Sequence, residues 1–109
     1  GGNTKRMTSP YDGTALIAAA HLGHVEIVRE LIRTGAPLDH INNLKWTALI
    51  EAIVLGDGGP NHQRIVQDLI AAGANLNLAD GRGDTPLILA RQRGYSAMIK
   101  MLVAAGAKP

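Results

Sequence analysis

The sequence Thr-Ala-Leu-Ile stands at residues 14–17 and again at residues 47–50, and Thr-Pro-Leu-Ile follows at residues 85–88. The first two of these segments begin 33 positions apart, and the second and third begin 38 positions apart. A Gly-Ala pair follows each segment, at residues 35–36, 73–74 and 106–107, and here the spacing is 38 and then 33 positions. The chain therefore repeats itself with a period of 33 positions. Periods of this size are typical of solenoid proteins.

The middle repeat contains five additional residues, and their position can be read from the landmarks on either side. Gly56 is 33 positions after Gly23, whereas Ile65 is already 38 positions after its counterpart Ile27, so the insertion lies within residues 56–65. It begins Gly-Asp-Gly-Gly, which is rich in glycine but lacks the Lys-Ser/Thr of a phosphate-binding loop. We expect a flexible insertion.

Each repeat has the pattern of two helices and a turn. In the first repeat, Thr14 is the expected cap of a helix over about residues 15–21, because a threonine side chain can accept a backbone hydrogen bond there. Gly23 ends that helix. Apolar residues then recur at helical spacing over about residues 25–33. Residues 37–46 lack this periodicity and predict an extended hairpin.

The composition bounds the functions that the chain can have. Its length of 109 residues suits a single domain. Hydrophobic residues make up 46% of the chain and charged residues 18%. This balance argues against disorder. The chain has no cysteine, which excludes disulfides and thiol chemistry, and no apolar run long enough to span a membrane. A net charge of +2 without a stripe of basic residues does not favour a nucleic-acid partner.

Three segments resemble the motifs of ankyrin-repeat proteins: Gly-Asp-Thr-Pro-Leu-Ile-Leu-Ala at 83–90, Gly-His-Val-Glu-Ile-Val at 23–28 and Ala-Ala-Gly-Ala-Asn-Leu-Asn at 71–77. The resemblance covers about residues 9–107. It implies an all-α fold, an ankyrin-repeat solenoid of stacked helix-turn-helix units joined by short hairpins. The glycine-rich insertion followed by Leu-Ala-Asp also resembles a subset of small bacterial ankyrin proteins. In the family, a histidine at the position of His24 caps the second helix through its side chain.

We expect residues 1–10 to be an N-terminal extension or a tag remnant, and residues 11–109 to be the ankyrin array. The repeats fall at about 11–43, 44–81 and 82–109. Polar residues in the last repeat suit the C-terminal end of an array. The first repeat has four consecutive residues without charge at 15–18, so it does not look like a cap. An upstream element could cover it, or residues 1–10 could fold back over it.

The resemblance implies that the chain binds another protein without catalysis, through its hairpin tips and the concave face formed by the first helices. The candidate partner-binding residues at those positions are Tyr11, Leu22, Ile41, Asn43, Leu44, Trp46, Val54, Leu55, Arg82 and Arg93. Several of them are apolar in the second repeat, and exposed apolar patches mark interaction sites. Lys45 stands where the family usually has a tip glycine, which raises the alternative that this hairpin bends differently.

Other interpretations of these residues stay open. The insertion could fold over Trp46, Val54 and Leu55, so that they form a small satellite core. The chain could instead be a self-associating scaffold fragment of a larger protein, a homo-oligomer formed through the uncapped first repeat. A weak nucleic-acid or anion binder would use a basic set of Lys5, Arg6, Arg82, Arg91 and Arg93.

No residue pattern predicts catalysis, a cofactor or a metal site. The aspartates fall mostly in predicted turns, where Asp is a turn former. His21 and His24 are close in the sequence, but Gly23 between them ends the helix that a metal site would need. His40 and His62 have no further ligands at a useful spacing. The absence of cysteine leaves both the cytoplasm and a bacterial periplasm open as locations.

Overall fold

The computed structural model of the chain describes residues 10–108, except for the side chains of residues 10–12. This part of the chain forms helices and turns without any strand, so the predicted all-α solenoid is confirmed. Its helices are α1 (Pro10–Leu22), α2 (Val25–Arg33), α3 (Ala48–Val54), α4 (Pro60–Ala72), α5 (Pro86–Arg93) and α6 (Ser96–Ala104).

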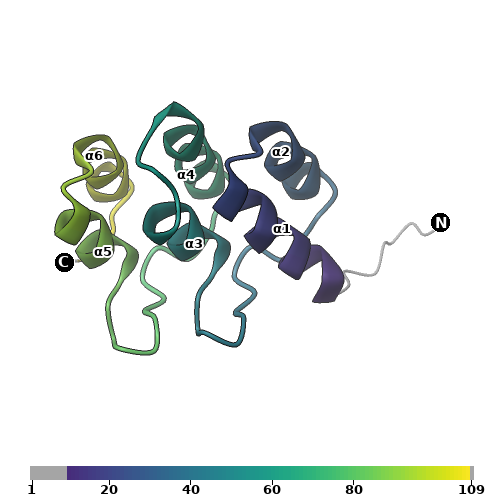
Figure 1. Cartoon of the computed structure of the whole chain (residues 1–109), viewed down its shortest axis with the longest axis horizontal. Coiled ribbons are helices and arrows are strands. Elements are labelled where there is room, and N and C mark those ends of the chain that lie inside the picture. Colours follow the sequence, from purple (N-terminus) through teal and green to yellow (C-terminus); the bar gives the residue numbers. More distant parts are fainter. Residues whose placement is uncertain (1–9, 109) are drawn as a thin grey trace.

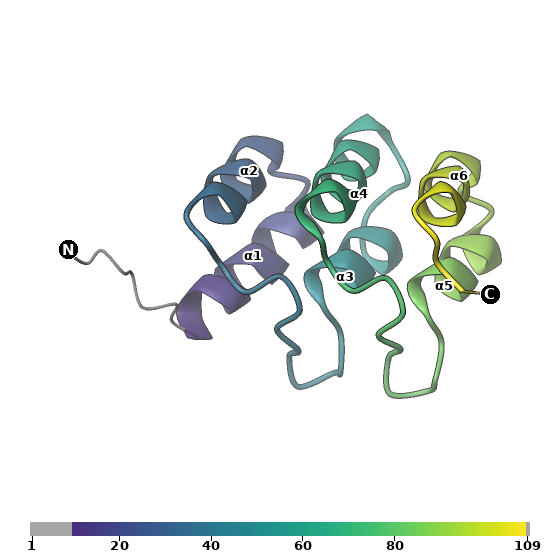
Figure 2. The ribbon, with the colours of Figure 1, turned by 180° about the vertical axis from the view of Figure 1, so that it is seen from behind.

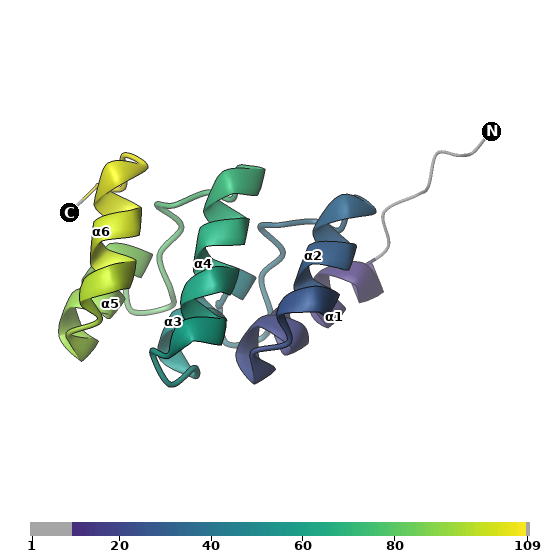
Figure 3. The same ribbon diagram turned by 90° about the horizontal axis from the view of Figure 1, so that it is seen from above.

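The helices form two layers. In Figure 1, α1, α3 and α5 lie side by side in one layer, and α2, α4 and α6 lie in the other. Viewed from above in Figure 3, the second layer is a row of roughly parallel helices. The first hairpin (residues 34–47) and the second hairpin (residues 73–85) project from the first layer on the same side, as Figure 2 shows from behind.

The repeated threonines cap helices in the second and third repeats. Thr47 Oγ1 accepts a hydrogen bond from the Ile50 N–H at 3.2 Å, and Thr85 Oγ1 accepts one from the Ile88 N–H at 3.3 Å. The prediction that Thr14 caps the first helix is wrong, because α1 begins at Pro10 and Thr14 lies inside it. The segment ahead of Thr14 continues the helix, and proline is favoured in a first helical turn.

The predicted side-chain cap of α2 is also absent. His24 occupies the N-cap position, but its side chain is exposed and makes no cap hydrogen bond. The Val25 N–H, one of the donors at this helix end, is hydrogen-bonded to the Gly23 carbonyl instead, at 3.1 Å. The turn around His24 is therefore closed by backbone atoms and does not involve the histidine side chain.

The five-residue insertion is partly helical. It provides a short loop, residues 56–59, and the extra first turn of α4, which has 13 residues where α2 has nine. The loop is held by Asp57, whose Oδ1 accepts a hydrogen bond from the Gly59 N–H at 2.8 Å. This bond, together with the neighbouring His62 imidazole, lowers the pKa of Asp57 below its ordinary value.

The extra turn of α4 contains a buried histidine that joins two repeats. His62 Nε2 donates to the His21 carbonyl at 2.9 Å, and Nδ1 lies 3.2 Å from Asp57 Oδ1. The ring fits beside two glycines, since a Cβ added at Gly23 or Gly56 would lie 3.0 or 2.4 Å from its atoms. The insertion therefore connects α4 to the end of α1.

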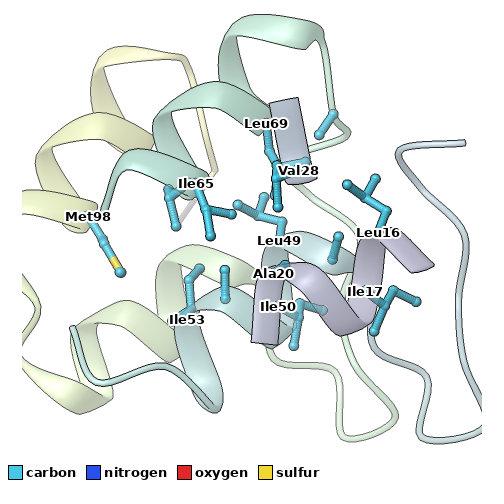
Figure 4. Packing of buried hydrophobic residues seen from close by; sticks show 14 of the residues in the cluster. Leu16, Ile17, Ala20, Val28, Leu49, Ile50, Ile53, Ile65, Leu69 and Met98 are labelled. Carbon is cyan, nitrogen blue, oxygen red and sulfur yellow. The ribbon is translucent and has the colours of Figure 1, made fainter. Parts of the chain in front are cut away.

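One apolar core runs through all three repeats (Figure 4). Its largest fully buried side chains come from both layers: Leu16, Val28, Leu49, Ile50, Ile53, Ile65, Val66, Leu69, Leu87, Met98 and Leu102. Small alanines such as Ala19, Ala52 and Ala90 are buried between them, as the close spacing of the layers requires. Outside this core, Arg29 Nε of α2 donates to Asp68 Oδ2 of α4 at 2.8 Å.

The turn of the first hairpin is built around Asn42. Its Oδ1 accepts hydrogen bonds from the N–H groups of Leu44 and Trp46, at 2.9 and 3.1 Å, and its own N–H donates to the Trp46 carbonyl. Asparagine readily closes a turn in this way. Lys45 has a φ of 66°, the only non-glycine residue in the described chain with a positive φ.

The second hairpin has the same turn. Asp80 Oδ1 accepts from the N–H groups of Arg82 and Asp84, at 2.9 and 3.0 Å, and Gly83 has a φ of 86°. The alternative in which Lys45 makes the first hairpin bend differently is therefore wrong. Lys45 adopts the positive φ that Gly83 has in the second hairpin, because the hydrogen bonds made by the Asn42 side chain and backbone fix the turn.

Replacing His62 should weaken the array far more than replacing His24, which is its equivalent in the first repeat. We expect His62→Ala to lower the free energy of unfolding by about 1–3 kcal/mol, because it removes a buried hydrogen bond between repeats. His24→Ala, at an exposed position, should change it by less than about 0.5 kcal/mol. Urea unfolding followed by circular dichroism measures both, and equal effects would contradict the role given to His62.

Lys45→Gly should stabilise the chain by about 1 kcal/mol, because glycine adopts a positive φ without the clash that a Cβ causes. The reciprocal change Gly83→Lys should destabilise it by a similar amount. The measurement is again the midpoint of urea unfolding. If Lys45→Gly lowers the unfolding midpoint, the contacts of the lysine side chain contribute more stability than the positive φ of Lys45 costs.

Candidate functional site

A groove of about 500 Å³ opens between the two hairpins, on the side of the first helix layer. Repeat two provides Leu44 and Trp46 from the first hairpin and Val54 from the end of α3. The second hairpin and α5 provide Asp80, Gly81, Arg82, Asp84, Leu89, Gln92 and Arg93. The groove thus joins candidate residues that lie far apart in the sequence.

The wall from repeat two is apolar. Leu44 is 60% exposed at the tip, whereas Trp46 and Val54 are half-buried, with one side against the core and the other lining the groove. Residues of the insertion do not line this groove, and the Gly58 loop lies against Tyr95 instead. The insertion therefore does not cover Trp46 and Val54 as the satellite-core interpretation required.

The opposite wall carries charge. Arg82 and Arg93 are exposed, and the ion pairs found among the described residues involve other side chains. Asp80 and Asp84 also line this wall, but Asp80 Oδ1 already accepts two backbone hydrogen bonds. Lys45 adds a third cation at the rim, where its side chain passes Gly81. Within the described part of the chain, the groove thus offers unpaired cations beside an apolar surface.

Two candidate residues lie on the other side of the first hairpin. Ile41, which is 45% exposed, and Asn43 line a second hollow together with Thr14 and His40. Leu44 borders both this hollow and the groove. The first hairpin therefore presents apolar side chains on two sides.

The remaining candidates lie outside the groove. Leu22 is 60% exposed at the end of α1, and Leu55 is 42% exposed just after α3. Arg91 is exposed on α5. The side chain of Tyr11, and all of Lys5 and Arg6, lie outside the described residues, so the proposed basic set is only partly described.

Sequence reasoning missed a buried carboxylate that positions the first hairpin. Glu51 of α3 is 4% exposed, accepts a hydrogen bond from Asn42 Nδ2 at 2.9 Å and lies 3.7 Å from His21 Nδ1. Asn42 in turn orients the N–H groups of Leu44 and Trp46. The available signal was a charge in the Thr-Ala-Leu-Ile-Glu segment, at a position that the other repeats fill with Ala18 or Leu89.

The described residues contain no group of three histidines and carboxylates close enough to hold a metal ion. None of the helices in residues 10–108 is both long and apolar enough to cross a membrane. His21 instead approaches Glu51, and its carbonyl accepts from His62.

Known proteins share this architecture. Two family models match the chain: "Ankyrin repeats (3 copies)" over residues 1–80 and "Ankyrin repeats (many copies)" over residues 59–103. A crystal structure of an ankyrin repeat domain from Acinetobacter baumannii AYE is 57% identical with a TM-score of 0.87. It covers 99% of this chain, which spans 55% of that domain.

Curated relatives agree with this assignment. The ankyrin repeat protein YahD of Escherichia coli (strain K12) is 46% identical over 98 residues, which are 89% of this chain and 49% of YahD. Human NF-kappa-B inhibitor alpha is 33% identical over 85 residues, or 78% of this chain and 25% of the inhibitor. The chain thus spans half or less of the length of these relatives. With a family model matching most of its residues, the chain belongs to the ankyrin-repeat family.

Proposed function

We propose that this chain is a non-catalytic interaction module that binds a partner protein through the groove between its two hairpins. Ankyrin repeats generally mediate protein–protein interaction, and their fold is typically non-catalytic. The observation that carries the proposal is the groove itself, where Leu44 and Trp46 face the cations Arg82 and Arg93. An aromatic anchor beside arginine is the composition of many interface hot spots.

The rigidity of the hairpins supports this role. Asn42 and Asp80 each hold two backbone N–H groups at the hairpin tips, and Glu51 holds Asn42 from the core. A surface that is already ordered loses little conformational entropy when a partner binds. The partner that fits best presents an apolar side chain for Trp46 and a carboxylate for the arginines.

The flanking candidates extend the proposed surface. Ile41 and Asn43 would contact the partner on the outer side of the first hairpin, and Leu55 beyond the end of α3. Tyr11 and Leu22 would do so in the first repeat. The name of NF-kappa-B inhibitor alpha describes a relative that acts on another protein, which supports a binding role here. We propose that the array is divided into repeats at about 11–43, 44–81 and 82–109, and that residues 1–10 form an extension ahead of it.

Trp46, the only tryptophan, should report on the groove. We expect acrylamide to quench its fluorescence partially in the free chain, because the indole is half-buried. Quenching should be weaker than for the urea-unfolded chain, because unfolding exposes the whole indole to the solvent. A bound partner should shield Trp46 from acrylamide further. Emission that acrylamide cannot reach in the free chain would contradict an open groove.

Affinity capture tests the groove directly, with the chain immobilised against a lysate of its source organism and bound proteins identified by mass spectrometry. A partner should be retained by the parent chain and lost by Leu44→Asp, because a charge at the tip replaces the apolar contact. We expect a loss of at least about tenfold in affinity, or about 1.4 kcal/mol.

Val103→Asp is the matched control, since Val103 is also an exposed apolar side chain, 51% exposed against 60% for Leu44, but lies on α6 and does not line the groove. It should retain the partner, and both variants should keep the circular dichroism spectrum and unfolding midpoint of the parent. A partner that the folded Leu44→Asp variant still binds equally well would refute the groove as the binding site.

A further inference from the structure

The tip of the first hairpin has a lysine where the second hairpin has a glycine. Lys45 and Gly83 are 38 positions apart and occupy the same place in the turn, with φ values of 66° and 86°. The Cβ of a lysine makes this conformation costly, so a glycine would fill the place with less strain. Residues held in strained conformations cluster at functional sites and ligand clamps. The position of Lys45 therefore points to a role for its side chain.

Contacts within the fold do not account for the lysine side chain. The Lys45 N–H donates to the Asn42 carbonyl at 3.0 Å, a bond that glycine makes equally well. Among the described residues, the ammonium group of Lys45 forms no hydrogen bond or ion pair. Its stem passes Gly81, where an added Cβ would lie 3.5 Å from Lys45 Cγ. The side chain thus reaches from the first hairpin to the second and keeps its charge available to a ligand.

Lys45 adds to a positive rim around the groove between the hairpins. Arg82 of the second hairpin and Arg93 of α5 line this groove and are exposed. The carboxylates in its lining, Asp80 and Asp84, are half-buried. Because the two hairpins project on the same side (Figure 2), a single ligand can meet cations from both of them.

We propose that Lys45 determines the specificity of the groove, and that its ligand is an acidic segment of the partner protein in which carboxylates flank an apolar side chain. The apolar side chain packs on Leu44 and Trp46, and the carboxylates meet Lys45 and Arg82. This inference rests on the proposed function of the groove. It adds the charge of the partner and the residue that recognises that charge.

A nucleic acid fits this groove less well than an acidic peptide. Asp80 and Asp84 lie in the same wall as the arginines, and they would repel a regular row of phosphates. A peptide can place its few carboxylates on the cations of the rim alone. Leu44, which is 60% exposed, also suits an apolar side chain better than a phosphate backbone.

A random peptide library displayed on phage tests the proposal, because every peptide in it is a probe of defined sequence. The parent chain and its Lys45→Met variant are immobilised, and peptides are selected against both in parallel. The substitution removes the charge and keeps an unbranched stem. Peptides enriched by the parent chain should be rich in Asp and Glu beside a large apolar residue, and the variant should select a weaker acidic bias.

Selected peptides are then synthesised with a fluorophore, and anisotropy measures their affinity. Lys45→Met should weaken binding by about threefold to fivefold, which is the range of an exposed ion pair. Lys45→Arg, which keeps the charge, should bind like the parent chain. Lys100→Met is the matched control and should change nothing, since Lys100 is an exposed lysine on α6 that does not line the groove.

The variant Lys45→Gly separates a binding role from a structural one. It should weaken peptide binding as much as Lys45→Met does, while its urea-unfolding midpoint rises because the strain is relieved. Weaker binding in a more stable chain is the result that a purely structural role of the lysine does not produce.

The outcomes distinguish this inference from the proposed function. If no peptide is enriched, or if Leu44→Asp binds the selected peptides as tightly as the parent chain, the groove is not the binding site and both proposals fail. Peptides that Leu44→Asp loses, but that lack an acidic bias or bind Lys45→Met like the parent chain, overturn the role of Lys45 alone. Fluorescent single-stranded DNA that binds through Lys45 where acidic peptides do not would replace the protein ligand by a nucleic acid.

Discussion

The burial of apolar side chains between neighbouring repeats is the interaction on which the rest of this structure depends. A single helix pair is too small to cover its own apolar residues, so each layer is completed by the next. The difference between Ile65, fully buried, and Ile27, half exposed, measures what a neighbour contributes. This packing brings all three repeats into one core (Figure 4) and keeps the hairpins in register.

Because the core is formed by a fixed subset of positions, the others are free to carry function. The hairpin tips place exposed residues such as Leu44, Lys45 and Arg82 outside the buried core, and Asn42 and Asp80 hold the turns that carry them. Their side chains therefore need only suit a partner. Glu51 is an exception, because its buried carboxylate connects α3 to Asn42 and couples the core to the apolar tip.

The insertion lengthens the second repeat by five residues, and the helices on either side of it still stack in the same two layers. Its extra helical turn places His62 over the end of α1, where Gly23 and Gly56 leave space for the ring. Its glycine loop lies against Tyr95 of the next repeat, at the position that corresponds to His62. A segment expected to be a flexible addition thus contacts the repeats on both sides.

The sequence alone determined the repeat period and the pattern of two helices and a turn in each repeat, because these follow from local pattern and spacing. Its resemblance to ankyrin repeats implied the all-α solenoid and the residues that occupy the hairpin tips. It did not determine where α1 begins, that His24 leaves its helix uncapped, or which tip residues meet. Trp46 and Arg93 are far apart in the sequence, and only the stacking of two repeats puts them in one groove. Tertiary structure decides such contacts, because they depend on how neighbouring repeats pack against each other and not on the sequence of either repeat alone.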